Sequence, residues 1–141
     1  MTPHKQKYKH DPENGIYGDC FRTSVACLLD VDPEEVPHSH RPDETGRRQN
    51  EVMRGYLSTK GYGLAVIPFY STATASAEEA ATLFSHFCPD QPYLLGGETG
   101  DGVGHVVICN GGEVIHNTGA NDVVGPTRPE LCYWLHLVTK L

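Results

Sequence analysis

Apolar side chains early in the chain recur at helical spacing. Within residues 19–30 they fall at i, i+4, i+7 and i+8, on one face of a helix: Phe21, Val25, Leu28 and Leu29. Asp19 stands at the N-cap position, where its carboxylate is expected to accept from the free amides of the first turn. Cys20 is then the first helical residue. Small side chains at Cys20, Ser24 and Cys27 form a second stripe, which allows close packing against another layer.

Two further helices and a short turn are predicted downstream. Residues 46–59 have inward-facing apolar positions at helical spacing. Ser76 and Glu79 form a capping box, which opens a helix over residues 76–87. Residues 32–35 (Asp-Pro-Glu-Glu) combine a cap, a proline at the first position and two acids, so they also begin a helical turn.

The second half of the chain has the alternation and turn residues of strands. An earlier strand over residues 64–70 contains Pro68, which indicates an edge position. The later strands are predicted at Tyr93–Leu95, His105–Cys109, Glu113–Asn117 and Tyr133–Thr139. Residues 110–112 (Asn-Gly-Gly) are a hairpin signal. A three-residue loop there places His105 opposite Asn117, whereas a two-residue loop pairs His105 with His116.

Because helices come first and antiparallel strands last, the order predicts an α+β fold with N-terminal helices packed on an antiparallel sheet. The length of 141 residues corresponds to one domain. We expect that domain over residues 14–141. Residues 1–13 are polar and contain two prolines, so we expect a mobile or edge-docked arm, and we favour a solvated tail over a half-exposed strand.

Composition and charge exclude several classes of function. The chain has 18 acidic and 11 basic side chains, a formal net charge of −7, which counts against binding to nucleic acid. Apolar runs fall short of the roughly 20 residues that span a bilayer, and the N-terminus lacks the apolar core of a secretory signal. We therefore expect a cytoplasmic protein without a membrane partner.

The cysteines and glycines point to neither a metal nor a nucleotide. The five cysteines are odd in number and show no CxxC spacing, so free thiols are expected and a zinc site is not. The glycine-rich stretch 96–104 lacks the Lys-Ser/Thr of a phosphate loop. We expect no cofactor, and we interpret this stretch as a rim beside His105. The single tryptophan, Trp134, is expected in the core.

Cys20 is the candidate nucleophile. A helix N-terminus and a neighbouring imidazolium both stabilise a thiolate, and they can lower the pKa of a cysteine to roughly 3.5–7.5. Cys20 meets the first condition from its position alone. The other cysteines lie inside predicted helices or strands, or at their ends, where cysteine behaves as a small apolar residue.

A base and an oxyanion donor complete the candidate site. His105 is the expected base, and the amide oxygen of Asn117 is expected to orient its ring. His116 is the alternative base if the hairpin has the other register. The Cys20 amide is one expected oxyanion donor, and Asn14, six residues upstream, is the candidate second donor, although Asn14-Gly15 is also a turn dipeptide.

These elements resemble the papain-like cysteine peptidase superfamily, and most closely its bacteriocin-processing branch. That branch has a glutamine six residues before an Asp-Cys pair, where this chain has Asn14 before Asp19-Cys20. The segment 104–108 (GHVVI) resembles its Gly-His strand, and Asn117 falls where the family places Asp or Asn. The similarity covers residues 14–30 and 92–118.

Three departures from the family pattern stand out: the shorter Asn14, Phe21 after the cysteine, and Asn117-Thr118 in place of Asp-Pro. The resemblance implies a bacterial or phage thiol protease with a papain-like fold. Its implied activity is hydrolysis of an amide (peptide, isopeptide or glutamine side chain) in a protein or peptide, through a thioester. A transglutaminase-like acyltransferase and an inactive binding or inhibitory module on the same fold are the alternatives. The oligomeric state is left open.

Overall fold

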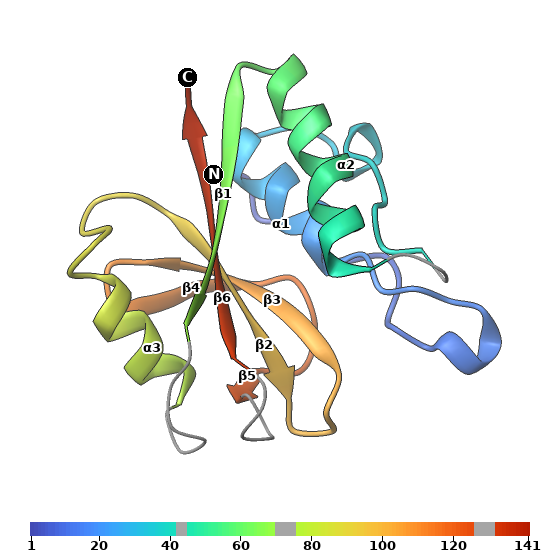
Figure 1. Cartoon of the computed structure of the whole chain (residues 1–141). Helices are drawn as coiled ribbons and strands as arrows, with labels where there is room; N and C mark the ends of the chain where they lie inside the picture. The colour runs from blue at the N-terminus through green and yellow to red at the C-terminus, as the bar shows by residue number, and fades with distance from the viewer. Residues whose placement is uncertain (42–44, 70–75, 126–131) are drawn as a thin grey trace.

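The fold combines helices with one antiparallel sheet (Figure 1). The computed structural model describes residues 1–41, 45–69, 76–125 and 132–141. Within these ranges six strands pair in the order β1-β6-β2-β3-β4, with β5 beside β2. The strands are β1 (Tyr62–Phe69), β2 (Tyr93–Thr99), β3 (Gly104–Asn110), β4 (Glu113–Asn117), β5 (Val123–Gly125) and β6 (Tyr133–Lys140). The predicted α+β class is confirmed, as is the edge position of β1.

The helices cover both faces of this sheet. In the described residues they are η1 (Pro12–Asn14), α1 (Cys20–Leu29), η2 (Pro33–Glu35), α2 (Gly46–Thr59) and α3 (Ala77–Phe84). Helices α1 and α2 pack on one face of the sheet, over a buried apolar cluster that they share. Helix α3 packs on the other face, over a second cluster. Met53 and Leu57 of α2 are fully buried, as the helical spacing predicts. Ser76 Oγ accepts from the Glu79 amide at 3.1 Å, so the predicted N-cap at Ser76 is confirmed.

Helix α1 begins at Cys20, but the predicted role of Asp19 is wrong. Asp19 occupies the N-cap position, but its side chain accepts no hydrogen bond from a backbone amide of the first turn. Its carboxylate, 1% exposed, accepts instead from the amides of Tyr8 at 2.9 Å and Lys7 at 3.4 Å, and from Nε of Arg22 at 3.3 Å. The capping residue is therefore used to hold the N-terminal segment.

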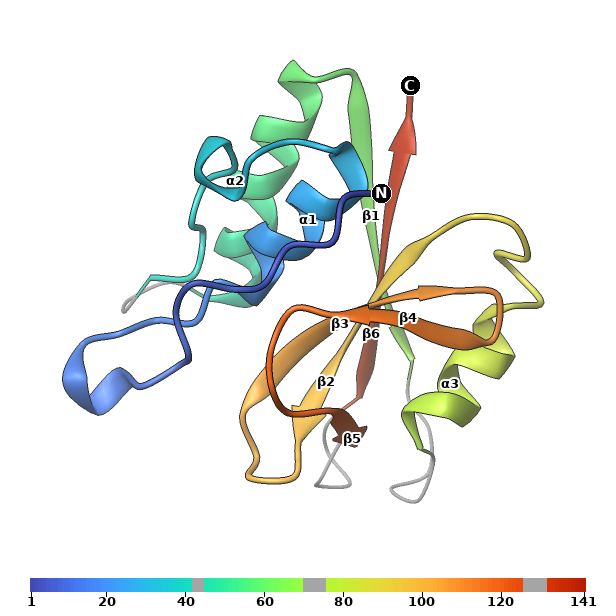
Figure 2. The ribbon, with the colours of Figure 1, turned by 180° about the vertical axis from the view of Figure 1, so that it is seen from behind.

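That use of Asp19 explains why the N-terminal segment is docked on the body, as in the edge-docked alternative, and is not a free tail, although most of its residues remain exposed. Residues 1–10 lie against α1 and the end of β4 (Figure 2). The Gln6 amide donates to the Thr118 carbonyl at 2.8 Å, and the Thr2 amide donates to the Cys27 carbonyl at 3.3 Å. Buried partners on the body satisfy the backbone of this polar segment, so it packs although it has few apolar residues.

The hairpin of β3 and β4 has neither of the two expected registers. Asn110 pairs with Glu113, so the loop is the two-residue Gly111-Gly112, and a β-bulge follows between Ile108 and Cys109. Beyond the bulge Val107 pairs with Asn117. His105 therefore lies diagonally across from Asn117 on the same face, a spacing that long side chains can bridge.

Several element boundaries also differ from the predictions. Strand β1 begins at Tyr62, and position 70 lies outside the described residues. Strand β2 extends through Gly96 and Gly97. The absence of a side chain at Gly97 lets β5 approach and pair with it, since a Cβ there would lie 2.4 Å from the Gly125 carbonyl oxygen of β5. Trp134 is 42% exposed, so the prediction that it is core is wrong. No helix in the described ranges is long and apolar enough to span a bilayer.

Candidate active site

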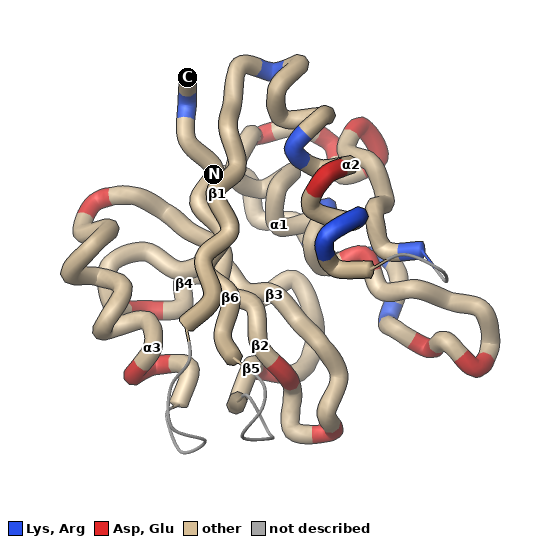
Figure 3. Tube along the Cα trace, viewed as in Figure 1, with Lys and Arg blue, Asp and Glu red and all other residues tan. Residues whose placement is uncertain are grey.

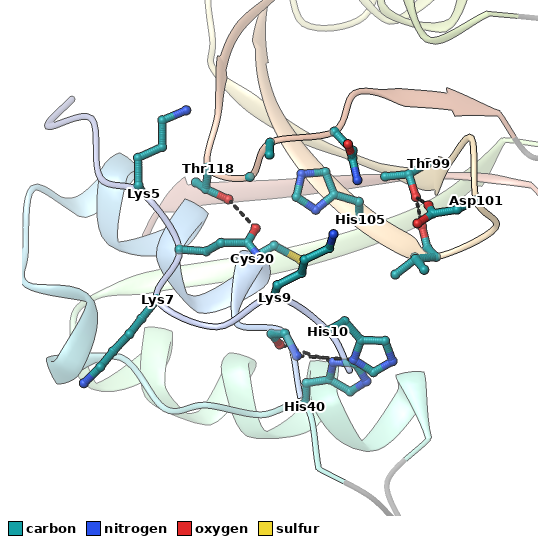
Figure 4. Close-up of a pocket in the computed structure, with 17 residues that line it drawn as sticks. Lys5, Lys7, Lys9, His10, Cys20, His40, Thr99, Asp101, His105 and Thr118 are labelled. Carbon is teal, nitrogen blue, oxygen red and sulfur yellow. Dashed lines mark hydrogen bonds between the residues drawn. The ribbon is translucent and has the colours of Figure 1, made fainter. Parts of the chain in front are cut away.

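Cys20 lies at the boundary of two cavities, both of which also include His105. The first, of about 460 Å³, is lined by the N-terminal segment, Cys20, His105 and the chain following β4. The second, of about 760 Å³, lies between α2 and the sheet. In Figure 4 the Cys20 sulfur and the His105 ring both face the space of the first cavity. The structure thus brings together two residues separated by most of the chain.

The protonation state of Cys20 differs from the expectation. The pKa of the thiol is raised to about 11, mainly by burial and to a lesser extent by the neighbouring Asp19 carboxylate. The backbone amides of Val106, Phe21 and Cys20 itself act in the opposite direction, by donating toward the sulfur. Desolvation outweighs the helix N-terminus here, so the prediction of a lowered pKa is wrong and the resting group is a neutral thiol.

The hydrogen bonds of Asn117 fix the tautomer of His105. The Asn117 Oδ1 atom lies 2.7 Å from His105 Nε2 and accepts from the Gly119 amide at 2.9 Å. Its Nδ2 atom donates to the Asn121 carbonyl at 2.9 Å and to Asp122 Oδ1 at 3.3 Å. The amide orientation is therefore determined on both sides. Because Oδ1 can only accept, Nε2 of His105 carries the proton and Nδ1 keeps its lone pair for the cavity.

Two residues considered at the sequence level lie elsewhere. Asn14 is exposed on η1, in a loop that projects from the body (Figure 2), and its side chain donates to Asp11 at 2.7 Å. It lines neither of the two cavities around Cys20, so its assignment as an oxyanion donor is wrong. The His116 ring bonds the His4 carbonyl through Nε2 at 2.7 Å, so His116 anchors the N-terminal segment and does not replace His105.

Gln6 is a site residue that the sequence did not reveal. Its side chain lines the first cavity, donating to the Tyr8 carbonyl at 2.8 Å and accepting from Thr118 Oγ1 at 3.5 Å. A Cβ on Gly119 would lie 2.8 Å from Gln6 Oε1 and 2.9 Å from His105 Cε1. Gln6 and the base thus lie against the same glycine. The expectation of a solvated arm concealed this residue.

Three histidines hold the Gly18 peptide two residues before the nucleophile. His38 Nε2 and His40 Nδ1 donate to the Gly18 carbonyl at 3.1 Å and 3.3 Å, and the Gly18 amide donates to His10 Nδ1 at 3.3 Å. The His10 and His40 rings stack with centroids 4.8 Å apart. Burial, then the neighbouring His10, lowers the pKa of His40, which favours the neutral ring. This cluster positions the turn that leads into Cys20.

The first cavity is more basic than the protein as a whole. Lys5, Lys7 and Lys9 of the N-terminal segment line it, although the chain carries a net charge of −7. Lys5 donates to the Asn117 carbonyl at 2.7 Å, and Lys7 pairs with Glu34 at 3.5 Å. Lys9 extends its amino group beside Cys20 and His105 in Figure 4. The basic segment therefore supplies positive charge to the cavity of the nucleophile.

The site has no cluster of metal ligands: within the described ranges no group of three or more His, Cys, Asp or Glu side chains could hold a metal ion. All five cysteines lie in those ranges, and none of them forms a disulfide bond there. Comparison of the chain with protein-family models, with curated proteins and with solved structures finds no match to any of them.

Proposed function

We propose that the protein is a papain-like cysteine hydrolase that cleaves an amide bond in a protein or peptide through Cys20, His105 and Asn117. The observation that carries the proposal is the hydrogen-bond set of Asn117, which leaves His105 Nδ1 as a lone-pair acceptor in the cavity of the Cys20 thiol. A nucleophile, a base and a group that orients the base are the parts that acyl transfer requires.

The chemistry begins from a neutral pair. As the sulfur bonds to the substrate carbonyl carbon, the thiol proton moves to His105 Nδ1, and the carbonyl oxygen becomes an oxyanion. The amide of Cys20, which has no partner within the helix at the first turn of α1, turns from the sulfur to donate to that oxyanion. The imidazolium then gives its proton to the departing amine, which leaves a thioester on Cys20. Water, deprotonated by Nδ1, attacks the thioester and restores the thiol.

The raised pKa of Cys20 makes His105 a base in the first step. In the described residues no hydrogen bond joins the thiol to the ring before substrate binds. Hydrogen bonds of this kind are often long in unliganded enzymes and shorten in the substrate complex. Substrate in the cavity is expected to bring the two groups together, and proton transfer then accompanies attack.

Product analysis in heavy-oxygen water tests this mechanism. The protein is incubated in H₂¹⁸O with peptides from a proteome digest, and the products are identified by mass spectrometry. Hydrolysis places one ¹⁸O in each new carboxylate. The Cys20→Ala and His105→Ala variants should form no product, whereas Asn14→Ala, an exposed position outside the site, should match the unaltered chain. Product formation that persists in Cys20→Ala would refute the proposal.

The same geometry serves a transglutaminase-like acyltransferase, in which an amine replaces water as the acceptor. Adding a primary amine such as cadaverine to the assay separates the two. A hydrolase yields ¹⁸O-labelled acids, and a transferase yields products that carry the mass of the amine.

The raised pKa of Cys20 favours a candidate without catalysis, an inactive binding or inhibitory module on the same fold. Such a module forms no product under any of these conditions, and its biological effect survives Cys20→Ala. Loss of that effect in Cys20→Ala would exclude it.

A further inference from the structure

The polar edge of the His136 ring, on β6, is the strongest unexplained feature near Cys20. The residue is 8% exposed, and its Nδ1 atom is buried with no hydrogen bond to any described residue. The Phe21 ring packs against it with centroids 5.1 Å apart. A buried polar atom left unpaired costs about 1–3 kcal/mol, so a ligand group that pairs with it recovers part of that energy.

The ring borders the second cavity, beside Cys20 and His105. A Cβ on Gly96 would lie 3.5 Å from His136 Cε1, and both residues line this cavity. Because Cε1 stands between the two nitrogens, the nitrogen-bearing edge of the ring faces the strand position that lacks a side chain. Because residue 96 is glycine, no side chain at this strand position covers that edge; Nδ1 itself is buried, so a ligand group reaches it through a small shift of the ring.

The walls around this edge are apolar, and the charges stand at the rim. Phe21, Val66 and Trp134 line the cavity. Charged side chains of opposite sign follow one another along α2 at its border (Figure 3). Arg47 pairs with Glu51 at 3.3 Å, and Arg54 Nε donates to the Leu64 carbonyl at 3.3 Å. The rim charges are engaged with the protein itself, and the interior suits an uncharged group.

We propose that this cavity is the subsite for a neutral substrate side chain with an apolar stem and a hydrogen-bonding tip, of which glutamine is the type, and that His136 recognises the tip. The inference rests on the proposed function, because the subsite adjoins Cys20 and the bond attacked is the neighbouring peptide bond. Burial lowers the pKa of His136 to about 4, so the ring is neutral at physiological pH. A carboxylate in the subsite would therefore lack a counter-charge at the ring.

Binding to the Cys20→Ala variant tests the subsite apart from catalysis. The probes are N-acetyl-glutamine methylamide and N-acetyl-methionine methylamide, which are similar in length and volume and differ in the amide tip. The protein is labelled with ¹⁵N-histidine and titrated with each probe by NMR. The His136 signals are assigned by their loss in His136→Phe. We expect the glutamine probe to bind about fivefold more tightly and to shift the His136 ring nitrogens.

Variants separate recognition from a structural role. The affinity ratio of the two probes should fall to about one in His136→Phe, and it should be unchanged in His86→Phe, at an exposed position after α3. A structural role would weaken both probes equally and leave their ratio unchanged. Equal affinities for Cys20→Ala, with unmoved His136 signals, would overturn the proposal and indicate that solvent satisfies the ring.

The two proposals fail separately in these assays. Selective binding of the glutamine probe without any hydrolysis by the unaltered chain would leave the subsite standing and reject the hydrolase. Hydrolysis of library peptides at sites with no enrichment of glutamine, together with equal probe affinities, would reject the subsite and keep the hydrolase.

Discussion

Replacing Asp19 by asparagine should detach the N-terminal segment and destabilise the fold. The substitution keeps the shape of the side chain but replaces one of the two carboxylate oxygens by an NH₂ group. That group must then face either the Tyr8 amide, 2.9 Å from the present Oδ1, or the Lys7 amide and Arg22 Nε, which lie at 3.4 Å and 3.3 Å from Oδ2. In both orientations a donor faces a donor in a site that is 1% exposed.

The magnitude follows from these partners. A hydrogen bond to a charged group contributes about 1.5–3 kcal/mol. Breaking a buried pair costs about 3–5 kcal/mol, because the remaining charge is left uncompensated. Arg22 keeps a second acid, Glu34, at 3.9 Å, which places the expected loss near the lower end, at about 3 kcal/mol. That loss is roughly a hundredfold in the folding equilibrium.

Urea unfolding at pH 7 measures the free energy, and hydrogen exchange of the Lys7 and Tyr8 amides reports on the segment. The matched control is Asp30→Asn, because Asp30 also holds the segment, through Thr2 Oγ1 at 2.8 Å and the N-terminal amine at 3.4 Å. Its side chain is 58% exposed, so its replacement should not be resolved in the unfolding curve. The reasoning is refuted if the two variants unfold alike and the Lys7 and Tyr8 amides stay protected in Asp19→Asn.

Three further predictions concern the site, the pH and the sheet. Asn117→Leu should reduce turnover by at least about tenfold with less change in KM, because the His105 ring loses its orienting acceptor; equal turnover in steady-state assays would contradict the mechanism. The free energy of unfolding should fall as the pH falls from about 6.5 to about 4, because the unfolded His136 ring takes up a proton over that range and the folded ring does not. The loss attributable to this residue is at most about 3 kcal/mol, and a urea series should show a flatter profile in His136→Phe. Gly97→Ala should destabilise the sheet by about 2 kcal/mol, since its Cβ would meet the Gly125 carbonyl, whereas Gly104→Ala meets nothing within 4 Å and should unfold like the unaltered chain.

Local sequence signals predicted the elements of this fold well. The helical spacing after Cys20, the Ser76 cap and the hairpin glycines act through the backbone of a few neighbouring residues, so a short stretch of sequence is enough to predict these elements. The α+β class and the edge position of β1 follow from the order of these elements and from a proline that cannot donate in a central strand.

Sequence signals whose outcome depends on distant partners predicted the structure less well. Asp19 has the right residue type and position for a cap, yet its carboxylate serves the amides of Tyr8 and Lys7. The bulge in β3 and β4 changed the expected register, although His105 and Asn117 still meet diagonally. A bulge has no short sequence signature, and its position depends on how the whole hairpin packs.

Spacing and turn residues act locally, so the chain alone indicated the helix that presents Cys20, the strand that carries His105 and the class of the fold. The packing of the whole chain placed a polar N-terminal segment along the cavity and Asn14 away from it. It also decided that burial keeps the Cys20 thiol protonated. Desolvation and long-range hydrogen bonds depend on which surfaces come together, and that information lies in the packed chain as a whole.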